Sequence, residues 1–231
     1  MEGVMRVPGI VLVLVLSFGV VAAQYRIVDE AEYRTACGAA VPVPLRARAE
    51  SYRMTLETKS SMEGRPSTDY ASRSVTSYQD RNKWHRLRES NFGTTKNVRE
   101  EITVDGKTYV REGNGEWSEF RPDTTSRFGD SVKTDTRYIS VEYRLLPDET
   151  LKGQTVKVCE KYEVAAVKTA GSESEARRES TSRFWVTNEG LLKSENSYRN
   201  ISEKGTATSW IKNEWETDPT IKVSIPAKFA Q

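Results

Sequence analysis

The sequence predicts a mainly β (α+β) protein: one strongly curved antiparallel sheet, forming an unclosed β-barrel of about 10–11 strands, with a few short helices on its concave side. Three observations predict this fold. Apolar and polar residues alternate with a period of two along most of the chain. Asp-Gly, Asn-Gly and Lys-Gly pairs recur between the alternating segments, and short turns of this kind join antiparallel neighbours. The 5 Trp and 10 Tyr supply buried area that the sparse aliphatic residues cannot.

The clearest pattern lies between Lys96 and Phe120 and predicts two successive hairpins. In Val98–Val104 the apolar residues occupy even positions, so one face of the strand can be buried. Asp105-Gly106 and Asn114-Gly115 tolerate the positive φ of tight reversals. Thr108–Arg111 and Trp117–Phe120 are therefore expected to follow as antiparallel strands.

The remaining chain continues this pattern on both sides of the two hairpins. Strands are expected near 51–57, 69–79, 82–89, 137–146, 154–168, 177–187, 191–202 and 206–217, with a short terminal edge at 221–225. Residues 28–37 are expected to form a helix that ends at Gly38. Arg121–Thr136 has no clear period and is interpreted as a loop or short helix that crosses the sheet as a candidate lid.

The first residues of the chain have the pattern of a secretory signal. Arg6 precedes the apolar run Ile10–Val21, and Ala22-Ala23 fits a cleavage site that would leave a mature chain of about 208 residues. An uncleaved anchor is the alternative. No lipid-accepting cysteine follows the run, so we expect an exported, periplasmic protein with a signal peptide (1–23), a helical or irregular segment (24–50) and one half-barrel domain (51–231).

Cys37 and Cys159 are the two cysteines of the sequence. An even count in an exported protein favours a disulfide. However, Cys159 lies between Lys157 and Lys161, on what the alternation indicates is the wetter face of its strand. The two residues remain a disulfide candidate, with two free thiols as the alternative.

The sequence contains no motif of covalent chemistry, and we expect no enzyme activity, cofactor or metal site. His85 is the single histidine, and it has no ligand-type partner at metal-binding spacing. No Gly-x-Ser-x-Gly turn, phosphate-binding glycine loop or HExxH helix is present. Carboxylates alternate with basic residues, and the net charge is only +2. The short Arg86-Leu87-Arg88 run is interpreted as a solvated strand face, so no nucleic-acid partner is expected.

The distribution of the aromatic residues gives the main functional hint. Trp and Tyr side chains lie on many different expected strands, and several in one concavity would form an apolar wall suited to acyl chains. The alternative is that they fill the core of a sheet with few aliphatic residues. The candidate cavity wall consists of Tyr52, Trp84, Trp117, Tyr143, Trp185 and Trp215.

Four segments together resemble a known family. They are Asp105–Phe120, Glu142–Val164, Ser182–Glu195 with its Phe-Trp-Val run before a Gly turn, and Gly205–Pro226 with its Ile and Pro finish. Their order and turn placement are similar to the periplasmic lipoprotein carriers (LolA-like) and the related mycobacterial lipid-carrying lipoproteins, over about Ser51–Pro226. The resemblance implies an unclosed β-barrel whose apolar cavity binds acyl chains.

The leading hypothesis is an exported carrier that binds a lipid, or the acyl chain of a lipoprotein, without covalent chemistry. A membrane-bound donor or acceptor protein would then be a further partner, and the carrier itself is expected to be a monomer. The alternative is an envelope sensor or protein-interaction module on the same fold, with its concave side filled by its own side chains.

Overall fold

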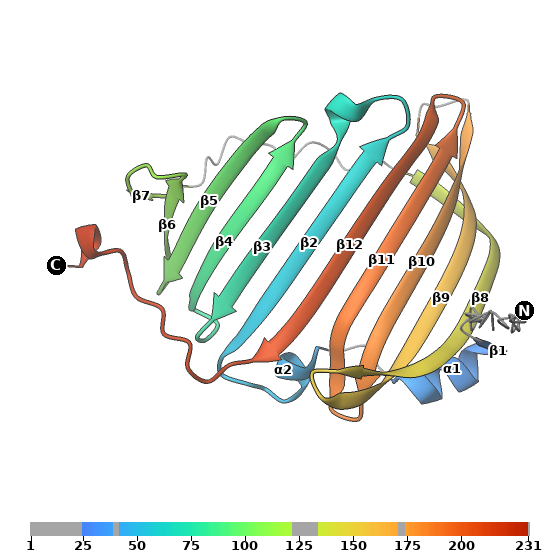
Figure 1. The fold of residues 1–231 in the computed structure, drawn as a ribbon, viewed down its shortest axis with the longest axis horizontal. Coiled ribbons are helices and arrows are strands. Elements are labelled where there is room, and N and C mark those ends of the chain that lie inside the picture. Colours follow the sequence, from blue (N-terminus) through green and yellow to red (C-terminus); the bar gives the residue numbers. More distant parts are fainter. Residues whose placement is uncertain (1–24, 39–41, 122–133, 171–173, 231) are drawn as a thin grey trace, which may run out of the picture.

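A computed structural model describes residues 25–38, 42–121, 134–170 and 174–230 of the chain. The described residues form a single curved antiparallel sheet of 12 strands that does not close into a barrel (Figure 1). The strands are paired in the order β1-β8-β9-β10-β11-β12-β2-β3-β4-β5-β6-β7, so β1 and β7 are the outermost strands. The predicted fold class is therefore confirmed, with slightly more strands than expected.

The strand bounds follow the alternating segments of the sequence. They are β1 (Arg26–Val28), β2 (Tyr52–Met62), β3 (Tyr70–Tyr78), β4 (Lys83–Phe92), β5 (Thr95–Val104), β6 (Lys107–Glu112), β7 (Ser118–Glu119), β8 (Thr134–Leu151), β9 (Gln154–Thr169), β10 (Glu175–Thr187), β11 (Gly190–Ser202) and β12 (Gly205–Thr217). Asp105 and Gly106 join β5 to β6 with φ of 49° and 83°, the two positive values that a type I′ turn requires. The two predicted hairpins are confirmed.

The helices are short and lie at the lower end of the sheet in Figure 1. Helix α1 (Glu30–Cys37) begins at Asp29, whose carboxylate accepts a 2.8 Å hydrogen bond from the Glu32 N–H, and Gly38 with φ of 59° ends it. Helix α2 (Val43–Arg46) has Pro44 in its first turn, where a missing N–H costs nothing. Two 3₁₀ turns are η1 (Pro66–Thr68) and η2 (Ala227–Phe229).

The sequence interpretation was wrong at three places. Val28 belongs to β1, which pairs with Tyr143–Leu145 of β8, and not to α1. Strand β8 runs through Pro147-Asp148, because the ladder to β9 skips both residues and the proline needs no hydrogen-bond acceptor there. Residues 221–225 form no strand, because both sides of β12 are already paired by β11 and β2.

Two predicted segments lie wholly or largely outside the described residues. The signal sequence 1–23 is one of them. Of the candidate lid Arg121–Thr136, residues 122–133 also lie outside, while Thr134–Thr136 are the first residues of β8. In the described part of the chain, no helix is long and apolar enough to cross a membrane.

The face of the sheet that carries Cys159, here called the disulfide face, holds α1 in place. Cys37 at the end of α1 and Cys159 of β9 form a disulfide, and Cys159 has no exposed surface. The expected wet position of Cys159 was wrong, because α1 covers β8 and β9 here and Tyr33 packs on Tyr143 with ring centroids 4.9 Å apart. Val186 and Leu191 complete this buried cluster.

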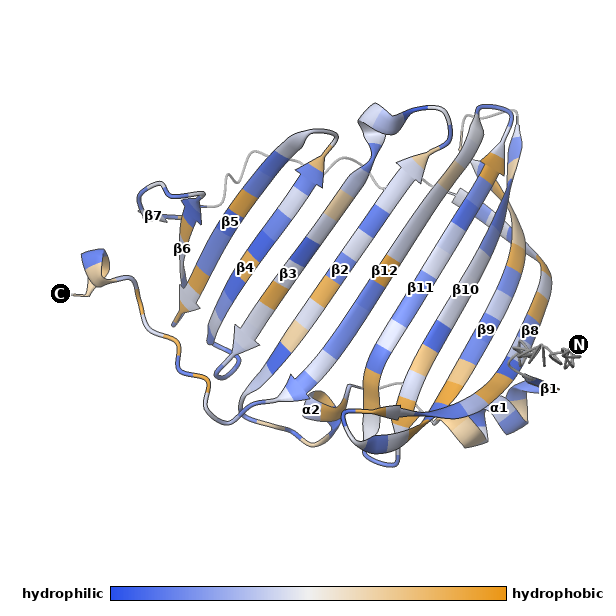
Figure 2. Ribbon diagram, in the orientation of Figure 1, coloured by the Kyte–Doolittle hydropathy of each residue, from blue (hydrophilic) through white to orange (hydrophobic). Residues whose placement is uncertain are grey.

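A second buried cluster lies on the opposite face, close to the first. Val156, Val158 and Trp185 pack together with partly buried leucines near the β8–β9 turn. The indole N–H of Trp185 donates to Glu149 at 2.8 Å, which ties β10 to the end of β8. Figure 2 shows hydrophobic residues gathered at the lower ends of β9, β10 and β11, whereas β2–β5 are largely hydrophilic with isolated hydrophobic positions.

The opposite face is here called the charged face, because acidic and basic residues alternate across it from strand to strand. The register places eight of them directly opposite one another in a single row from β8 to β4: Arg144, Glu160, Arg183, Glu195, Lys212, Glu57, Arg73 and Glu89. Opposite charges on directly opposed residues stabilise strand pairing. This row, the charge ladder, therefore supports the register of strands that have few apolar residues.

Candidate functional site

A groove of about 510 Å³ lies on the disulfide face over β12, β2, β3 and β4. The alternation of β2 points Leu56, Thr58 and Ser60 to this face, and β3 opposes them with Ser74, Ser72 and Tyr70. The small hydroxyl side chains leave space above the sheet that larger residues would occupy. The residues that line the groove from this face are Met54, Leu56, Thr58, Ser60, Tyr70, Ser72, Ser74, Arg86, Arg88, Ser209 and Ile211.

One end of the groove is apolar. Met54 and Leu56 of β2 lie beside Ile211 of β12, and all three side chains are only partly buried. Trp215 pairs directly with Met54 and packs against the cluster around Cys159. The apolar end therefore continues into the hydrophobic core beneath α1.

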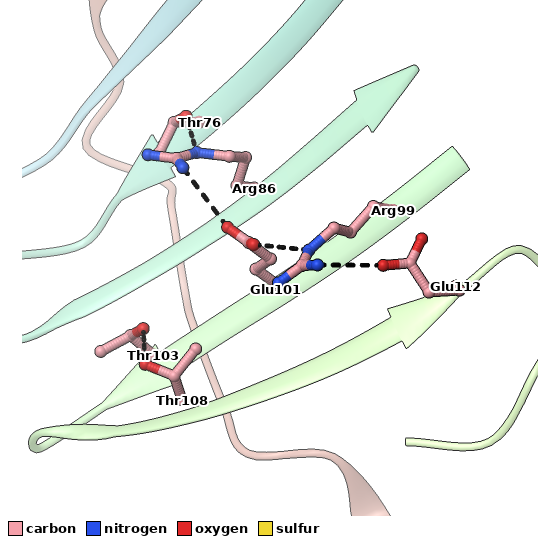
Figure 3. A network of polar contacts seen from close by, with 7 residues as sticks. All are labelled: Thr76, Arg86, Arg99, Glu101, Thr103, Thr108 and Glu112. Atoms are coloured by element: carbon pink, nitrogen blue, oxygen red, sulfur yellow. Dashed lines mark hydrogen bonds and ion pairs between the residues drawn. The ribbon is translucent and has the colours of Figure 1, made fainter. Parts of the chain in front are cut away.

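The other end of the groove carries Arg86 and Arg88 of β4, and Arg86 contacts Glu101 of β5 (Figure 3). Glu101 accepts from Arg86 at 3.3 Å and from Arg99 at 2.7 Å, and Arg99 also donates to Glu112 at 3.1 Å. The Nε of Arg86 donates to Thr76 Oγ1 at 3.2 Å, and Thr76 is fully buried. These contacts fix Arg86 and Arg99 in charge-neutralising pairs.

Arg88 is held differently from these two arginines. Its guanidinium donates to the Tyr70 hydroxyl at 2.5 Å, and among the described residues no carboxylate lies within ion-pair distance of it. Hydrogen bonds with Ser72 and Arg88 lower the pKa of Tyr70, against burial, which raises it. Ser72 in turn shares a 2.7 Å hydrogen bond with Thr58, so a chain of hydroxyls positions Arg88 at the end of the groove.

Two further hollows lie near this groove. A cleft of about 1030 Å³ at the lower end of the sheet is bounded by α2, by Pro219–Lys222 and by the stacked rings of Tyr52 and Tyr78, whose centroids are 4.5 Å apart. A hollow of about 610 Å³ lies mainly over the charged face around Trp210 and Lys59. In the groove at Arg88, the apolar side chains gather at one end, over β2 and β12, and the arginines at the other end, on β4.

The structure does not bring the six predicted aromatic residues into one wall. Tyr52, Trp84, Tyr143 and Trp215 lie on the disulfide face, but they are dispersed between the lower cleft, β4 and the core beneath α1. Trp185 lies on the opposite face, with the Lys193 ammonium 3.8 Å from its ring centroid. Trp117 lies between β6 and β7, with the Arg111 guanidinium 4.9 Å from its ring.

Sequence reasoning missed Arg88 and the hydroxyl residues of the groove. The Arg86-Leu87-Arg88 run was interpreted as a solvated strand face. Its spacing did contain a signal, since residues two apart on a strand point to the same face and both arginines therefore reach one site. Ser and Thr also occur at alternate positions of β2 and β3, which indicates that one face of these strands carries small polar side chains with space above them.

His85 lies on the charged face and does not contribute to the groove. Its Nε2 lies 2.8 Å from Glu100 Oε1, and Arg111 also pairs with Glu100. Burial raises the pKa of Glu100, but hydrogen bonds from Arg111 and His85 outweigh it and hold that pKa below its ordinary value. In the described part of the chain, no group of three or more His, Cys, Asp or Glu residues could hold a metal ion.

Comparisons with known proteins add little to this geometry. No protein-family model matches the chain, and no curated protein is similar to it. A solved structure to which the chain is similar is that of a LolA superfamily protein from Nitrosomonas europaea, at 8% sequence identity and a TM-score of 0.30. The match covers 88% of this chain and 98% of that one, but a similarity at this TM-score carries no argument about fold or function.

Proposed function

We propose that this protein is an exported carrier that binds the acyl chain of a lipid, or of a lipidated protein, in the groove on its disulfide face. The observation that carries the proposal is the groove itself, whose volume of about 510 Å³ exceeds the ~300 Å³ at the lower limit of ordinary ligand pockets. Its floor of Met54, Leu56 and Ile211 offers apolar contact without complete burial by the protein's own residues.

Binding would be driven by removal of methylene groups from water, at about 0.8 kcal/mol for each one buried. No covalent step is required, and the ligand would leave to a membrane or to a membrane-bound acceptor protein. The signal-like start of the sequence and the Cys37–Cys159 disulfide support export, because disulfides persist in oxidising compartments such as the periplasm.

The proposal is tested by exposing delipidated protein to vesicles of bacterial envelope lipids and weighing the recovered protein by native mass spectrometry. We expect one bound acyl lipid per chain. Leu56→Asn changes the groove floor and should reduce the bound fraction, whereas Val75→Asn is the matched control. Val75 lies on the neighbouring strand but on the charged face. Recovery of lipid-free protein under all conditions would refute the carrier function.

A protein-interaction module is the second candidate, and one observation favours it. Tyr138, Ile139 and Val141 of β8 are 58%, 56% and 41% exposed, and β1 pairs only with Tyr143–Leu145 of that strand. Among the described strands, residues 138–141 of β8 pair only with β9, and a strand edge that is open on one side and carries exposed apolar residues can accept a strand from another protein. A photo-reactive residue at position 139 that crosslinks a second protein, together with lipid-free native mass spectra, would favour this candidate over the carrier.

A further inference from the structure

Two arginines that face each other across neighbouring strands are the feature that points to the chemistry of the ligand. The register places Arg88 of β4 directly opposite Arg99 of β5 on the disulfide face. Like charges at directly opposed positions destabilise strand pairing. The rest of the sheet avoids this arrangement, as the charge ladder on the other face shows. The Arg88–Arg99 pair is therefore a local cost to stability that the fold itself does not explain.

The carboxylates near this pair neutralise only part of its charge. Glu101 and Glu112 bind Arg99, and Glu101 also binds Arg86, so these two guanidinium groups take up both carboxylates. Within this cluster of arginines, Arg88 has no carboxylate partner among the described residues, and its side chain is exposed at the end of the groove. The Tyr70 hydroxyl holds it in place, but a hydroxyl contributes no full negative charge.

We propose that the groove selects an amphiphile with a carboxylate or phosphate headgroup, that Arg88 binds this oxyanion, and that the hydrocarbon chain extends over Leu56 to Ile211. This inference rests on the acyl-binding function proposed above and adds the charge of the ligand. A guanidinium can donate two parallel hydrogen bonds to a carboxylate or phosphate, and such charge-assisted bonds are about twice as strong as neutral ones.

The geometry of the groove fits a ligand of this kind. From β4 to β12 the groove crosses three strand spacings, which is about 14 Å. Along this path the ligand would pass from Arg88, over the low floor at Ser74 and Ser72, to the apolar residues of β2 and β12. The bound oxyanion would also neutralise Arg88, the member of the Arg88–Arg99 pair that has no carboxylate partner among the described residues.

The test compares two ligands of equal chain length in the purified protein, palmitate and hexadecanol, by displacement of a fluorescent fatty acid. We expect palmitate to bind about tenfold more tightly than hexadecanol, because one charge-assisted hydrogen bond increases affinity by about this factor. Arg88→Gln should remove this difference by weakening palmitate binding, and Arg88→Lys should restore part of it. Arg73→Gln is the matched control, because Arg73 lies on the adjacent strand but on the charged face, paired with Glu57.

Each outcome of this comparison decides a separate point. Equal binding of palmitate and hexadecanol by the unmodified protein would overturn the headgroup inference and leave the acyl-binding function standing. Binding of neither compound would overturn the function and the inference together. A second displacement series compares inorganic phosphate with hexadecyl phosphate. Equal displacement by both would show a small-anion site and would overturn the role of the hydrocarbon chain. Arg88→Gln should fold normally, because it removes a like-charge contact; its circular dichroism and urea midpoint check this.

Discussion

Replacing Glu160 with Gln tests the energetic role of the charge ladder at its most buried position. The Glu160 side chain is 6% exposed, and it accepts hydrogen bonds from Arg144 at 2.9 Å and from Arg183 at 3.1 and 2.7 Å. The amide of glutamine retains a single acceptor oxygen and turns an N–H group toward one of the arginines. The substitution therefore leaves at least one guanidinium facing a donor, with no negative charge between the two.

The expected destabilisation follows from these contacts. Breaking a buried ion pair by removing one partner costs about 3–5 kcal/mol. The arginine side chains are 20% and 37% exposed, and Arg144 keeps a second carboxylate in Glu142, so the lower end of that range applies. We expect Glu160→Gln to lower the free energy of unfolding by about 3 kcal/mol, which corresponds to about 6–12 °C in Tm for a domain of this size.

Equilibrium urea unfolding at neutral pH, with the disulfide intact, measures this free energy. Glu57→Gln is the control within the same ladder, because Glu57 pairs at 3.5 Å with Arg73, whose side chain is 63% exposed. Exposed pairs of this kind contribute less than about 1 kcal/mol. Losses below 1 kcal/mol for both variants would refute the reasoning, since burial of Glu160 would then have no measurable effect.

Three further predictions concern α1 and the charged face. Cys37→Ser should cost about 4–5 kcal/mol in stability, because the Cys37–Cys159 disulfide closes a loop with a sequence separation of 122 residues; urea midpoints unchanged by reduction would contradict this. The buried Tyr33 hydroxyl has no hydrogen-bond partner in the described structure, so Tyr33→Phe should stabilise the protein at pH 7 by about 1 kcal/mol. Burial, with smaller effects of Tyr143 and Glu160, raises the pKa of Tyr33 to about 12. Because this hydroxyl ionises at a lower pH in the unfolded chain than in the folded protein, Tyr33 makes stability fall as pH rises from 10 to about 12 and has no pH-dependent effect below pH 10. An alkaline unfolding limb identical in Tyr33→Phe would refute this assignment. Because the pKa of Glu100 is lower in the folded protein than its ordinary value of 4.5, ionised Glu100 stabilises the fold above pH 4.5, and this stability is lost as the pH falls through the folded pKa. The loss of stability in acid should therefore be shallower in Glu100→Gln.

The sequence was sufficient to predict β2–β6 and β9–β12, because alternation and turn residues are local signals. In β12 the pattern placed Ser209, Ile211 and Trp215 on one face and Lys212 with Glu214 on the other, and the register confirms this division. The turn at Asp105-Gly106 was equally clear, since few residue pairs tolerate two positive φ values.

The sequence was insufficient where a contact between distant elements decides the outcome. The burial of Cys159 depends on α1, which is more than a hundred residues away in the chain and is held over β8 and β9 by the disulfide, by the Tyr33–Tyr143 contact and by packing of Ala36 on the cluster around Cys159. Glu160 is an acidic residue on an otherwise apolar face of β9, and the β9 sequence alone did not explain it. Its two arginine partners lie on the neighbouring strands β8 and β10.

The groove could not be predicted because the register between strands decides which side chains lie next to one another in it. The alternation of β4 alone puts Arg86 and Arg88 on one face, but only the pairing of β4 with β5 brings Arg99 opposite Arg88. The six aromatic residues predicted to form a cavity wall gave a misleading indication, because they lie in different parts of the sheet and on both of its faces and do not line one shared hollow.

The charge ladder has a consequence for how the chain avoids misfolding. A slip of one residue between strands turns side chains to the wrong face and is rejected by burial, but a slip of two residues preserves every face. In this sheet a two-residue slip of β11 along β12 would place Glu195 against Glu214 in one direction, or Lys193 against Lys212 in the other. Charge repulsion thus disfavours the two-residue slip, which leaves the burial of each face unchanged. This matters in strands that have few apolar residues to fix their register.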